Sequence, residues 1–163
     1  MTPINREILR AELERDEGLK LKAYKDTVGK WTIGVGRNLD DVGLRLHEME
    51  KLNISLDSVK LKGITGEQAM YLLDSDIDGV MVDLDMHLPW WRTLDEVRQR
   101  VLCNMCFNLG INGLMGFKNT LKLISTKRYR EAADNMLLSK WAGQVGKRAN
   151  RLADLMRLGP IAA

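Results

Sequence analysis

The sequence has few of the residues that would tie a protein together through covalent links or a metal. Only two cysteines occur, Cys103 and Cys106, and they lie three residues apart in a helical pattern. A metal site at this spacing would need two further ligands, but the two histidines, His47 and His87, are far apart in the sequence. We therefore expect reduced thiols packed on a helix face, with no disulfide and no metal.

Long hydrophobic runs are also missing. No apolar stretch reaches 18 residues, so we expect no membrane-spanning helix and no stable membrane insertion. The first seven residues lack the apolar segment of a secretory signal, which predicts synthesis in a cytoplasm without a signal peptide. The net charge of +3 would favour any polyanion and selects none.

Hydrophobic periodicity divides the 163 residues into a mixed first part and a helical second part, the pattern of an α+β fold that is mostly helical. Capping boxes at 65–68 and 93–96 each predict the start of a helix. Aromatic and β-branched residues around Tyr24 and Trp31 predict a small antiparallel sheet, with a turn over 26–29. The predicted helices cover 3–16, 45–52, 66–84, the stretch from the second box to Gly110, 119–125, 129–138 and 147–158.

The segment 16–36 carries the residues best suited to chemistry. Glu17 is predicted in the last turn of the first helix, with Gly18 as the stop signal. The negative end of the helix dipole there favours the protonated carboxyl that a general acid requires. Asp26 follows in the predicted turn and Thr32 in the next strand. Two acids nine residues apart are not a motif by themselves, so their surroundings must decide.

This segment resembles the catalytic segment of the T4-type phage lysozymes (glycoside hydrolase family 24). That pattern is Glu, eight residues, Asp, five residues and Thr, and Glu17, Asp26 and Thr32 occupy its three positions. Further segments match the family in order, so that the resemblance covers nearly the whole chain: 104–110, 116–121, 128–135 and 139–141.

The resemblance implies one lysozyme domain over 1–163 with a lysozyme-like fold. A small lobe at about 15–64 would hold the antiparallel sheet, and a helix at about 65–84 would join it to a helical lobe at about 85–163 that includes the helix at 3–16. Arg37 would then lie near Asp76. We expect a monomer.

The implied activity is that of an endolysin, a muramidase that cuts the β-1,4 bond between N-acetylmuramic acid and N-acetylglucosamine in peptidoglycan to lyse the bacterial host. Glu17 would protonate the leaving oxygen, while Asp26 would stabilise positive charge and activate a water held by Thr32, giving inversion. No cofactor is needed. The family's contacts with the glycan strand would fall on Asn38 or Leu39, Phe107, Thr120 and Asn135.

Two further residues and three alternatives complete the predictions. Tyr24 and Arg148 are weaker candidates for supporting roles, and the pattern favours a solvated helix face for Arg148. The alternatives are a lytic transglycosylase, a non-catalytic wall-binding module, and nucleic-acid binding through the basic residues of 147–157. An apolar stripe in that last helix favours packing, so we expect no nucleic-acid partner. The enzyme would reach the wall after the membrane is permeabilised.

Overall fold

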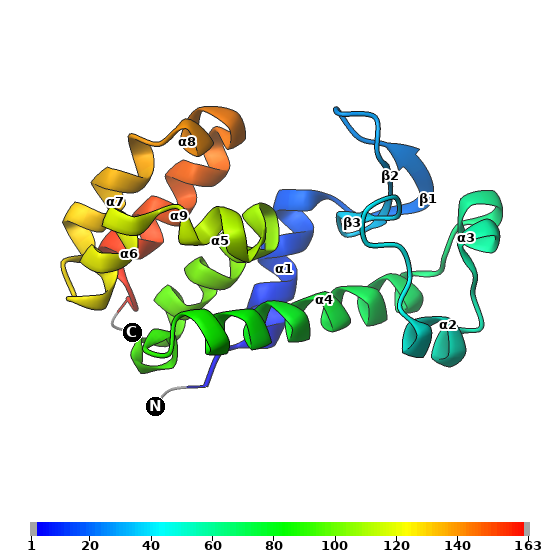
Figure 1. The fold of residues 1–163 in the computed structure, drawn as a ribbon, viewed down its shortest axis with the longest axis horizontal. Coiled ribbons are helices and arrows are strands. Elements are labelled where there is room, and N and C mark those ends of the chain that lie inside the picture. The colour runs from blue at the N-terminus through cyan, green and yellow to red at the C-terminus, as the bar shows by residue number, and fades with distance from the viewer. Residues whose placement is uncertain (1–2, 162–163) are drawn as a thin grey trace. The chain divides into compact units, whose positions relative to one another are not determined.

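Residues 3–161 are described by a computed structural model, in which one helix, a small sheet and then a series of helices follow one another along the chain (Figure 1). This arrangement confirms the predicted α+β, mostly helical, lysozyme-like fold. The elements in chain order are α1 (Arg6–Glu17), β1 (Lys20–Lys25), β2 (Trp31–Gly34), β3 (Arg37–Asn38), α2 (Leu46–Leu52), α3 (Leu56–Lys62), α4 (Gly66–His87), the 3-10 helix η1 (Trp91–Thr93), α5 (Glu96–Met115), α6 (Lys118–Ser125), α7 (Tyr129–Leu137), α8 (Lys140–Val145) and α9 (Lys147–Leu158).

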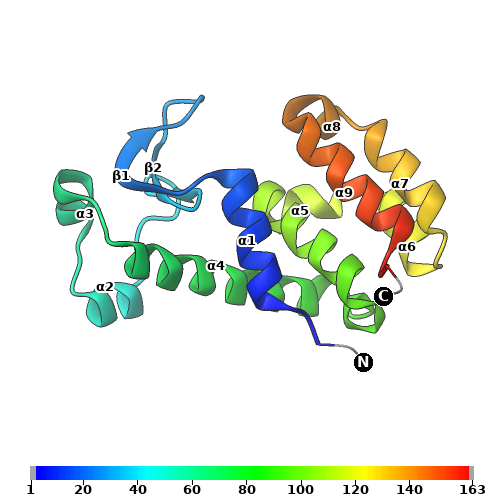
Figure 2. The ribbon, with the colours of Figure 1, turned by 180° about the vertical axis from the view of Figure 1, so that it is seen from behind.

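The chain forms two compact units. The smaller, Arg10–Asp78, contains the sheet together with α2 and α3. The larger combines the chain up to Leu9 with the residues from Gly79 onward, and it contains α5 to α9, which lie together in Figure 2. Both boundaries fall inside helices, one in α1 and one in α4.

The sheet of the smaller unit is antiparallel, in the order β1-β2-β3. Thr32 in β2 is paired with Tyr24 in β1 and with Asn38 in β3, so these three side chains share one face of the sheet. The turn between β1 and β2 closes where predicted, because the Gly29 N–H donates to the Asp26 carbonyl at 3.0 Å. Behind the sheet lies a small apolar core made of Ile33, Leu39, Val59, Ile64, Ala69 and Leu72.

The larger unit has a broader apolar core, in which α9 packs against α5, α7 and α8, and α6 packs against α7. Cys103 and Cys106 are free and buried in α5, as expected for thiols on a packed helix face. Burial, helped by the charge of Asp83, raises the pKa of the Cys106 thiol to about 12, which leaves it protonated and unreactive at neutral pH.

One of the two predicted capping boxes is present. Thr65 caps α4, accepting from the Gln68 N–H at 3.1 Å while Gln68 accepts from the Thr65 N–H at 2.9 Å. The second prediction was wrong: Thr93 belongs to η1, and Asp95 caps α5 by accepting from the Arg98 N–H. A carboxylate two residues later in the chain therefore outcompetes the threonine hydroxyl.

The other helix predictions differ from the structure mainly in two short elements. α3 and α8, of seven and six residues, were not predicted because a pattern of that length shows less than two full periods. The predicted end at Gly110 is visible as a break inside α5, where Gly110 has φ +72° and ψ 163°. In the part of the chain covering 3–161, no helix is both long enough and apolar enough to cross a membrane.

Candidate active site

Glu17 is the last residue of α1, and two glycines determine its surroundings. Gly18 follows with φ +80°, and its N–H donates to the Glu14 carbonyl at 2.8 Å, so the helix ends as predicted. Gly36, at φ +66°, lies directly against the acid: a Cβ at this position would stand 2.7 Å from the Glu17 Oε1 atom. The backbone between β2 and β3 therefore packs on the carboxyl group, and only glycine leaves room for it.

Asp26 is held by the turn in which it lies. Its Oδ1 atom accepts from the backbone N–H groups of Val28 at 3.0 Å and Lys30 at 2.9 Å, and its own N–H donates to the Lys30 carbonyl. Within residues 3–161 no group donates to the second carboxylate oxygen, Oδ2. The turn thus fixes one oxygen and leaves the other available to a ligand or a water molecule.

Thr32 is 5% exposed, and its hydroxyl donates to the Lys30 carbonyl at 3.1 Å. Because a hydroxyl has one hydrogen and two lone pairs, this bond leaves Oγ1 as an acceptor. The strand register places Thr32 on the same sheet face as Tyr24, and Asp26 follows directly after the end of β1.

Tyr24 is influenced by the charges of both acids. Its phenol pKa is raised, first by burial and then by the negative charges of Glu17 and Asp26. Both carboxylates therefore lie within electrostatic range of one phenol, although they belong to a helix end and to a turn. Glu17, Asp26 and Thr32 are thus all placed near Tyr24 in the smaller unit. From the sequence alone, Tyr24 was only a weaker candidate.

The two neighbouring residues predicted to contact sugar differ in accessibility. Leu39 is 2% exposed and belongs to the core behind the sheet. The Asn38 side chain is half-buried and orders the next loop, since its Oδ1 accepts from the N–H groups of Asp40 and Asp41 and its Nδ2 donates to Asp41. Of the pair, only Asn38 presents polar atoms near the surface.

In the larger unit, the structure brings Thr120 and Asn135 together. Thr120 Oγ1 in α6 donates to Asn135 Oδ1 in α7 at 2.5 Å, and both residues line a cavity of about 660 Å³. The Asn135 amide keeps its N–H donors for a ligand. Phe107 is half-buried in α5 and does not line this cavity. No contact with sugar was predicted for the other lining residues, which are Gly113, Gly116, Phe117, Lys118, Asn119, Leu138 and Ser139.

The predicted proximity of Arg37 and Asp76 is confirmed, with Arg37 Nε and Nη2 each 3.0 Å from an Asp76 oxygen. The sequence did not reveal the second partner, Glu48. This carboxylate is fully buried and accepts from Arg37 Nη1 at 2.8 Å and Nη2 at 2.6 Å. It also accepts from the Arg45 N–H at the start of α2, the one local signal that could have identified it.

The ionisation of Glu48 follows from these contacts. Burial on its own raises the pKa of this carboxyl, but hydrogen bonds from Arg37, the Arg45 backbone and Ser75, together with the Arg37 charge, lower the pKa to about 2. The pKa of Arg37 is raised, because the hydrogen bonds and charges of Glu48 and Asp76 outweigh its burial. Glu48 is therefore ionised at neutral pH and anchors the turn that carries Gly36.

Arg148 corrects a prediction. It is 7% exposed rather than solvated, and its Nε donates to Asn104 Oδ1 at 2.9 Å. Leu152 and Met156, from the apolar stripe of the same helix, are buried as the pattern indicated. Among residues 3–161 no group of three or more His, Cys, Asp or Glu side chains could hold a metal ion.

Comparisons with known proteins give a single family. The family described as phage lysozyme matches residues 14–157. A protein named probable T4-type lysozyme 1, from Dictyostelium discoideum, is 32% identical over 93% of this chain and 94% of its own length. The endolysin of Salmonella phage P22 is 33% identical over 81% of this chain and 80% of its own. A third relative, the pre-baseplate central spike protein Gp5 of Enterobacteria phage T4, is 31% identical over 91% of this chain but only 27% of its own length.

Proposed function

The chain belongs to the phage lysozyme family, and from this membership we propose that it cuts the β-1,4 bond between N-acetylmuramic acid and N-acetylglucosamine. It is a peptidoglycan-lytic lysozyme, with peptidoglycan as its substrate. The bond, the stereochemistry and the biological setting are the parts that we propose.

The observation that carries the proposal is the pair of acids around Tyr24. Glu17 and Asp26 lie nine residues apart on unlike backbone elements, and both act on the pKa of one phenol. Two carboxylates on opposite sides of a glycosidic bond are the usual apparatus for its hydrolysis. One must donate a proton and the other must remain ionised.

We assign the acid role to Glu17. Its position in the last turn of α1 sets it at the negative end of the helix dipole, and Gly36 packs on its carboxyl group. We therefore take Glu17 as the group that protonates the leaving oxygen. We assign the role of base to Asp26, because its Oδ1 is held by two backbone N–H groups while its Oδ2 is available.

A water molecule between Asp26 and Thr32 would complete the reaction. Asp26 Oδ2 is available to take one hydrogen of this water, and the Thr32 oxygen can accept the other because its own proton is bonded to Lys30. With both hydrogens engaged, a lone pair of the water is directed at the sugar. Attack from the face opposite the leaving group inverts the anomeric centre.

We assign sugar contacts to the predicted residues that line a cavity or lie near the surface, of which Thr120 is the most buried, at 1% exposed. In the smaller unit this residue is Asn38. In the larger unit, Thr120 and Asn135 offer a hydroxyl and an amide in one cavity, and Phe107 offers an aromatic surface for the apolar face of a sugar. Leu39 would contribute only by anchoring β3 through the core.

We further propose that the protein lyses a bacterial host at the end of phage growth, acting on the wall once the membrane has been permeabilised. The name endolysin, carried by the phage P22 relative, supports this role. The relatives from Dictyostelium discoideum and the central spike protein of phage T4 carry other names, so the role in host lysis requires its own test.

Mass spectrometry of fragments from purified peptidoglycan tests the proposed bond and reaction. A muramidase releases fragments that end in reducing N-acetylmuramic acid. Fragments ending in the anhydro sugar, one water lighter, would identify a lytic transglycosylase instead, and reducing N-acetylglucosamine ends would mean that the other glycosidic bond is cut. Intact glycan with bound protein would identify a wall-binding module.

A further inference from the structure

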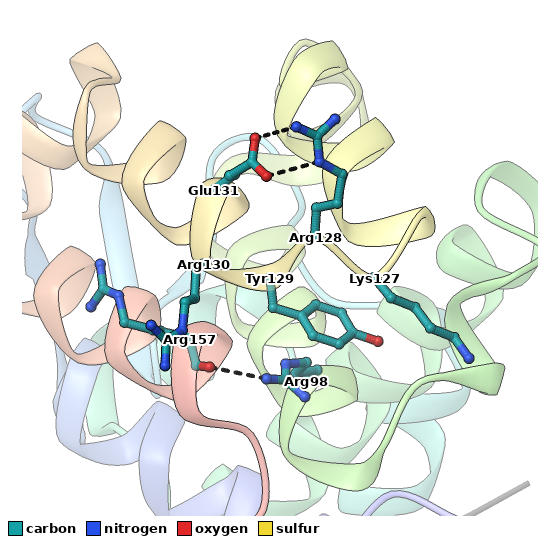
Figure 3. A pocket seen from close by; sticks show the side chains of 7 residues that line it. All are labelled: Arg98, Lys127, Arg128, Tyr129, Arg130, Glu131 and Arg157. Atoms are coloured by element: carbon teal, nitrogen blue, oxygen red, sulfur yellow. Dashed lines mark hydrogen bonds and ion pairs between the residues drawn. The ribbon is translucent and has the colours of Figure 1, made fainter.

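A second pocket, in the larger unit, is lined mainly by cations. It has a volume of about 360 Å³ and lies beside the start of α7 (Figure 3). Five of its seven lining residues are basic, against one carboxylate. The lining consists of Arg98, Lys127, Arg128, Tyr129, Arg130, Glu131 and Arg157.

Existing ion pairs account for some of this charge but not for all of it. Arg128 is paired with Glu131, and Arg157 with Asp134 and Asp154 on the exposed surface. Within residues 3–161 no carboxylate lies in ion-pair distance of Lys127 or Arg130, and both side chains are exposed. Two positive charges at the pocket are therefore left without a protein counter-charge.

The floor of the pocket is rigid. Arg98 lies under the ring of Tyr129, with its guanidinium carbon 3.6 Å from the ring centroid. Its Nε donates to the Met156 carbonyl at 2.7 Å and its Nη2 to the Arg157 carbonyl at 3.2 Å, which satisfies carbonyls at the end of α9. Its Nη1 donates to Asp95. Figure 3 shows Lys127 on one side of this stack and Arg157 on the other.

The sequence around α7 is unfavourable for an isolated helix. Lys127, Arg128 and Arg130 place three cations at the positive end of the helix dipole, where anions are preferred. Arg128 is the N-cap residue but makes no side-chain cap bond to the first turn. A bound anion would relieve this repulsion and accept from first-turn N–H groups. Local conflicts of this kind occur where function requires them.

We propose that this pocket binds a phosphate group. A phosphate monoester carries about −1.5 to −2 charges at pH 7 and has three acceptor oxygens, which matches two unpaired cations and a helix start. The pocket holds one such group rather than a strand of them. Tyr129, the one aromatic residue among the described residues that line it, is stacked on Arg98, so one ring face is unavailable for a nucleic-acid base. The phosphate could come from a lipid headgroup or from a soluble ester.

The test is a titration of the 15N-labelled full chain with inorganic phosphate at pH 7 and constant ionic strength, followed by amide chemical shifts. We expect saturable changes centred on residues 129–131, with a dissociation constant in the millimolar range. The variant Lys127→Gln/Arg130→Gln should weaken binding by roughly tenfold or more. Both side chains are exposed, so the fold should be retained, as circular dichroism would verify.

A matched control removes the same charge elsewhere. Lys51→Gln/Lys62→Gln changes two exposed lysines in the smaller unit, and phosphate binding should be unchanged. Both variants should digest purified peptidoglycan at the wild-type rate, because none of these residues belongs to the proposed active site. Equal weakening in the two variants, or changes without saturation, would overturn the proposal.

Sedimentation with vesicles of phosphatidylcholine and phosphatidic acid distinguishes the two sources of phosphate. Co-sedimentation that is lost in Lys127→Gln/Arg130→Gln and kept in the control would identify a lipid headgroup. Saturable inorganic phosphate binding without co-sedimentation would identify a soluble ester. Binding of a single-stranded oligonucleotide that depends on Lys127 and Arg130, in the absence of saturable phosphate binding, would contradict the single-phosphate site and indicate a nucleic-acid surface.

Discussion

Each of the two compact units is stabilised by a different kind of interior. The smaller one has six buried apolar residues in its core cluster and adds a buried ion network, in which Arg37 is 2% exposed and Glu48 is fully buried. The larger one relies on a broad apolar core. Its buried Arg98 binds mainly backbone carbonyls, and the carboxylate it contacts, Asp95, is partly exposed.

This difference matters because the proposed catalytic acids lie in the unit with the smaller core. A three-stranded sheet covers little apolar surface, and apolar contacts alone would locate its loops loosely. The Arg37 network ties β3, α2 and α4 together through hydrogen bonds of defined direction. The catalytic residues are thus positioned by directional polar contacts, while the larger unit presents polar groups from a well-packed helical frame.

The largest expected effect is a loss of lytic rate, without a loss of stability, when a proposed catalytic acid of the smaller unit is replaced. Glu17→Gln keeps the shape of the side chain and removes the acid, so the rate of lysis should fall by about 10²–10⁴ or more, with stability unchanged or slightly raised. Asp26→Asn should cause a comparable loss and stay folded, since an amide oxygen can still accept from Val28 and Lys30. Turbidity assays on cell walls and urea unfolding measure the two quantities.

The second-largest effect tests whether the buried ion network of Arg37 and Glu48 stabilises the smaller unit, whose apolar core is small. Glu48→Gln leaves Arg37 buried with only part of its counter-charge, and we expect the free energy of unfolding to fall by about 3 kcal/mol at pH 7. Arg45→Gln is the matched control, because Arg45 is 40% exposed and touches the same carboxylate. Its loss should be below about 1 kcal/mol. Equal losses in both variants would show that burial of the network is not what stabilises it.

The contribution of Glu48 to the free energy of unfolding should also depend on pH. The folded pKa of Glu48 is about 2, below its ordinary value of 4.5, so its contribution is present above about pH 4.5 and is lost as the pH falls toward 2. The shift corresponds to about 3 kcal/mol. Unfolding free energies of wild type and Glu48→Gln should converge across that window. Curves that remain parallel down to pH 2 would show that Glu48 is not the responsible group.

The smallest expected effect concerns the contact between Gly36 and Glu17. Gly36→Ala introduces strain at φ +66° that costs about 1–2 kcal/mol, and it pushes against Glu17 Oε1. The displaced acid should lower the lytic rate by about tenfold or more. Gly146→Ala also introduces a Cβ at a positive φ, +58°, but no atom lies within 4 Å of the new Cβ. That control should lose stability and keep the wild-type rate.

The sequence was sufficient for features that depend on local pattern or on a family motif. Helix α9, the Thr65 cap, the turn after Asp26 and the pairing of Arg37 with Asp76 were all predicted. Prediction from the sequence failed where a partner distant in the chain determines whether a charged side chain is buried. Glu48 looks like any surface acid of a short helix until Arg37 is placed against it, and Arg148 looks solvated until Asn104 is found beside it.

The cavity around Thr120 and Asn135 shows the same limit. Thr120 and Asn135 were predicted from the family resemblance, but the contact between them depends on how α6 and α7 pack. Leu39 is a related case, because a leucine near a sugar site and a leucine in a core have the same sequence pattern. Only the core cluster behind the sheet distinguishes these two possibilities.

The central claim is that Asp26 and Thr32 direct a water molecule, and the anomeric configuration of the first product tests it most directly. Proton NMR spectra taken early in the digestion of a defined glycan strand, before mutarotation, record which anomer is released. We predict release of the α-anomer from the β-linked substrate, the result of a single displacement. Release of the β-anomer first, or capture of a glycosyl ester on Asp26, would contradict it.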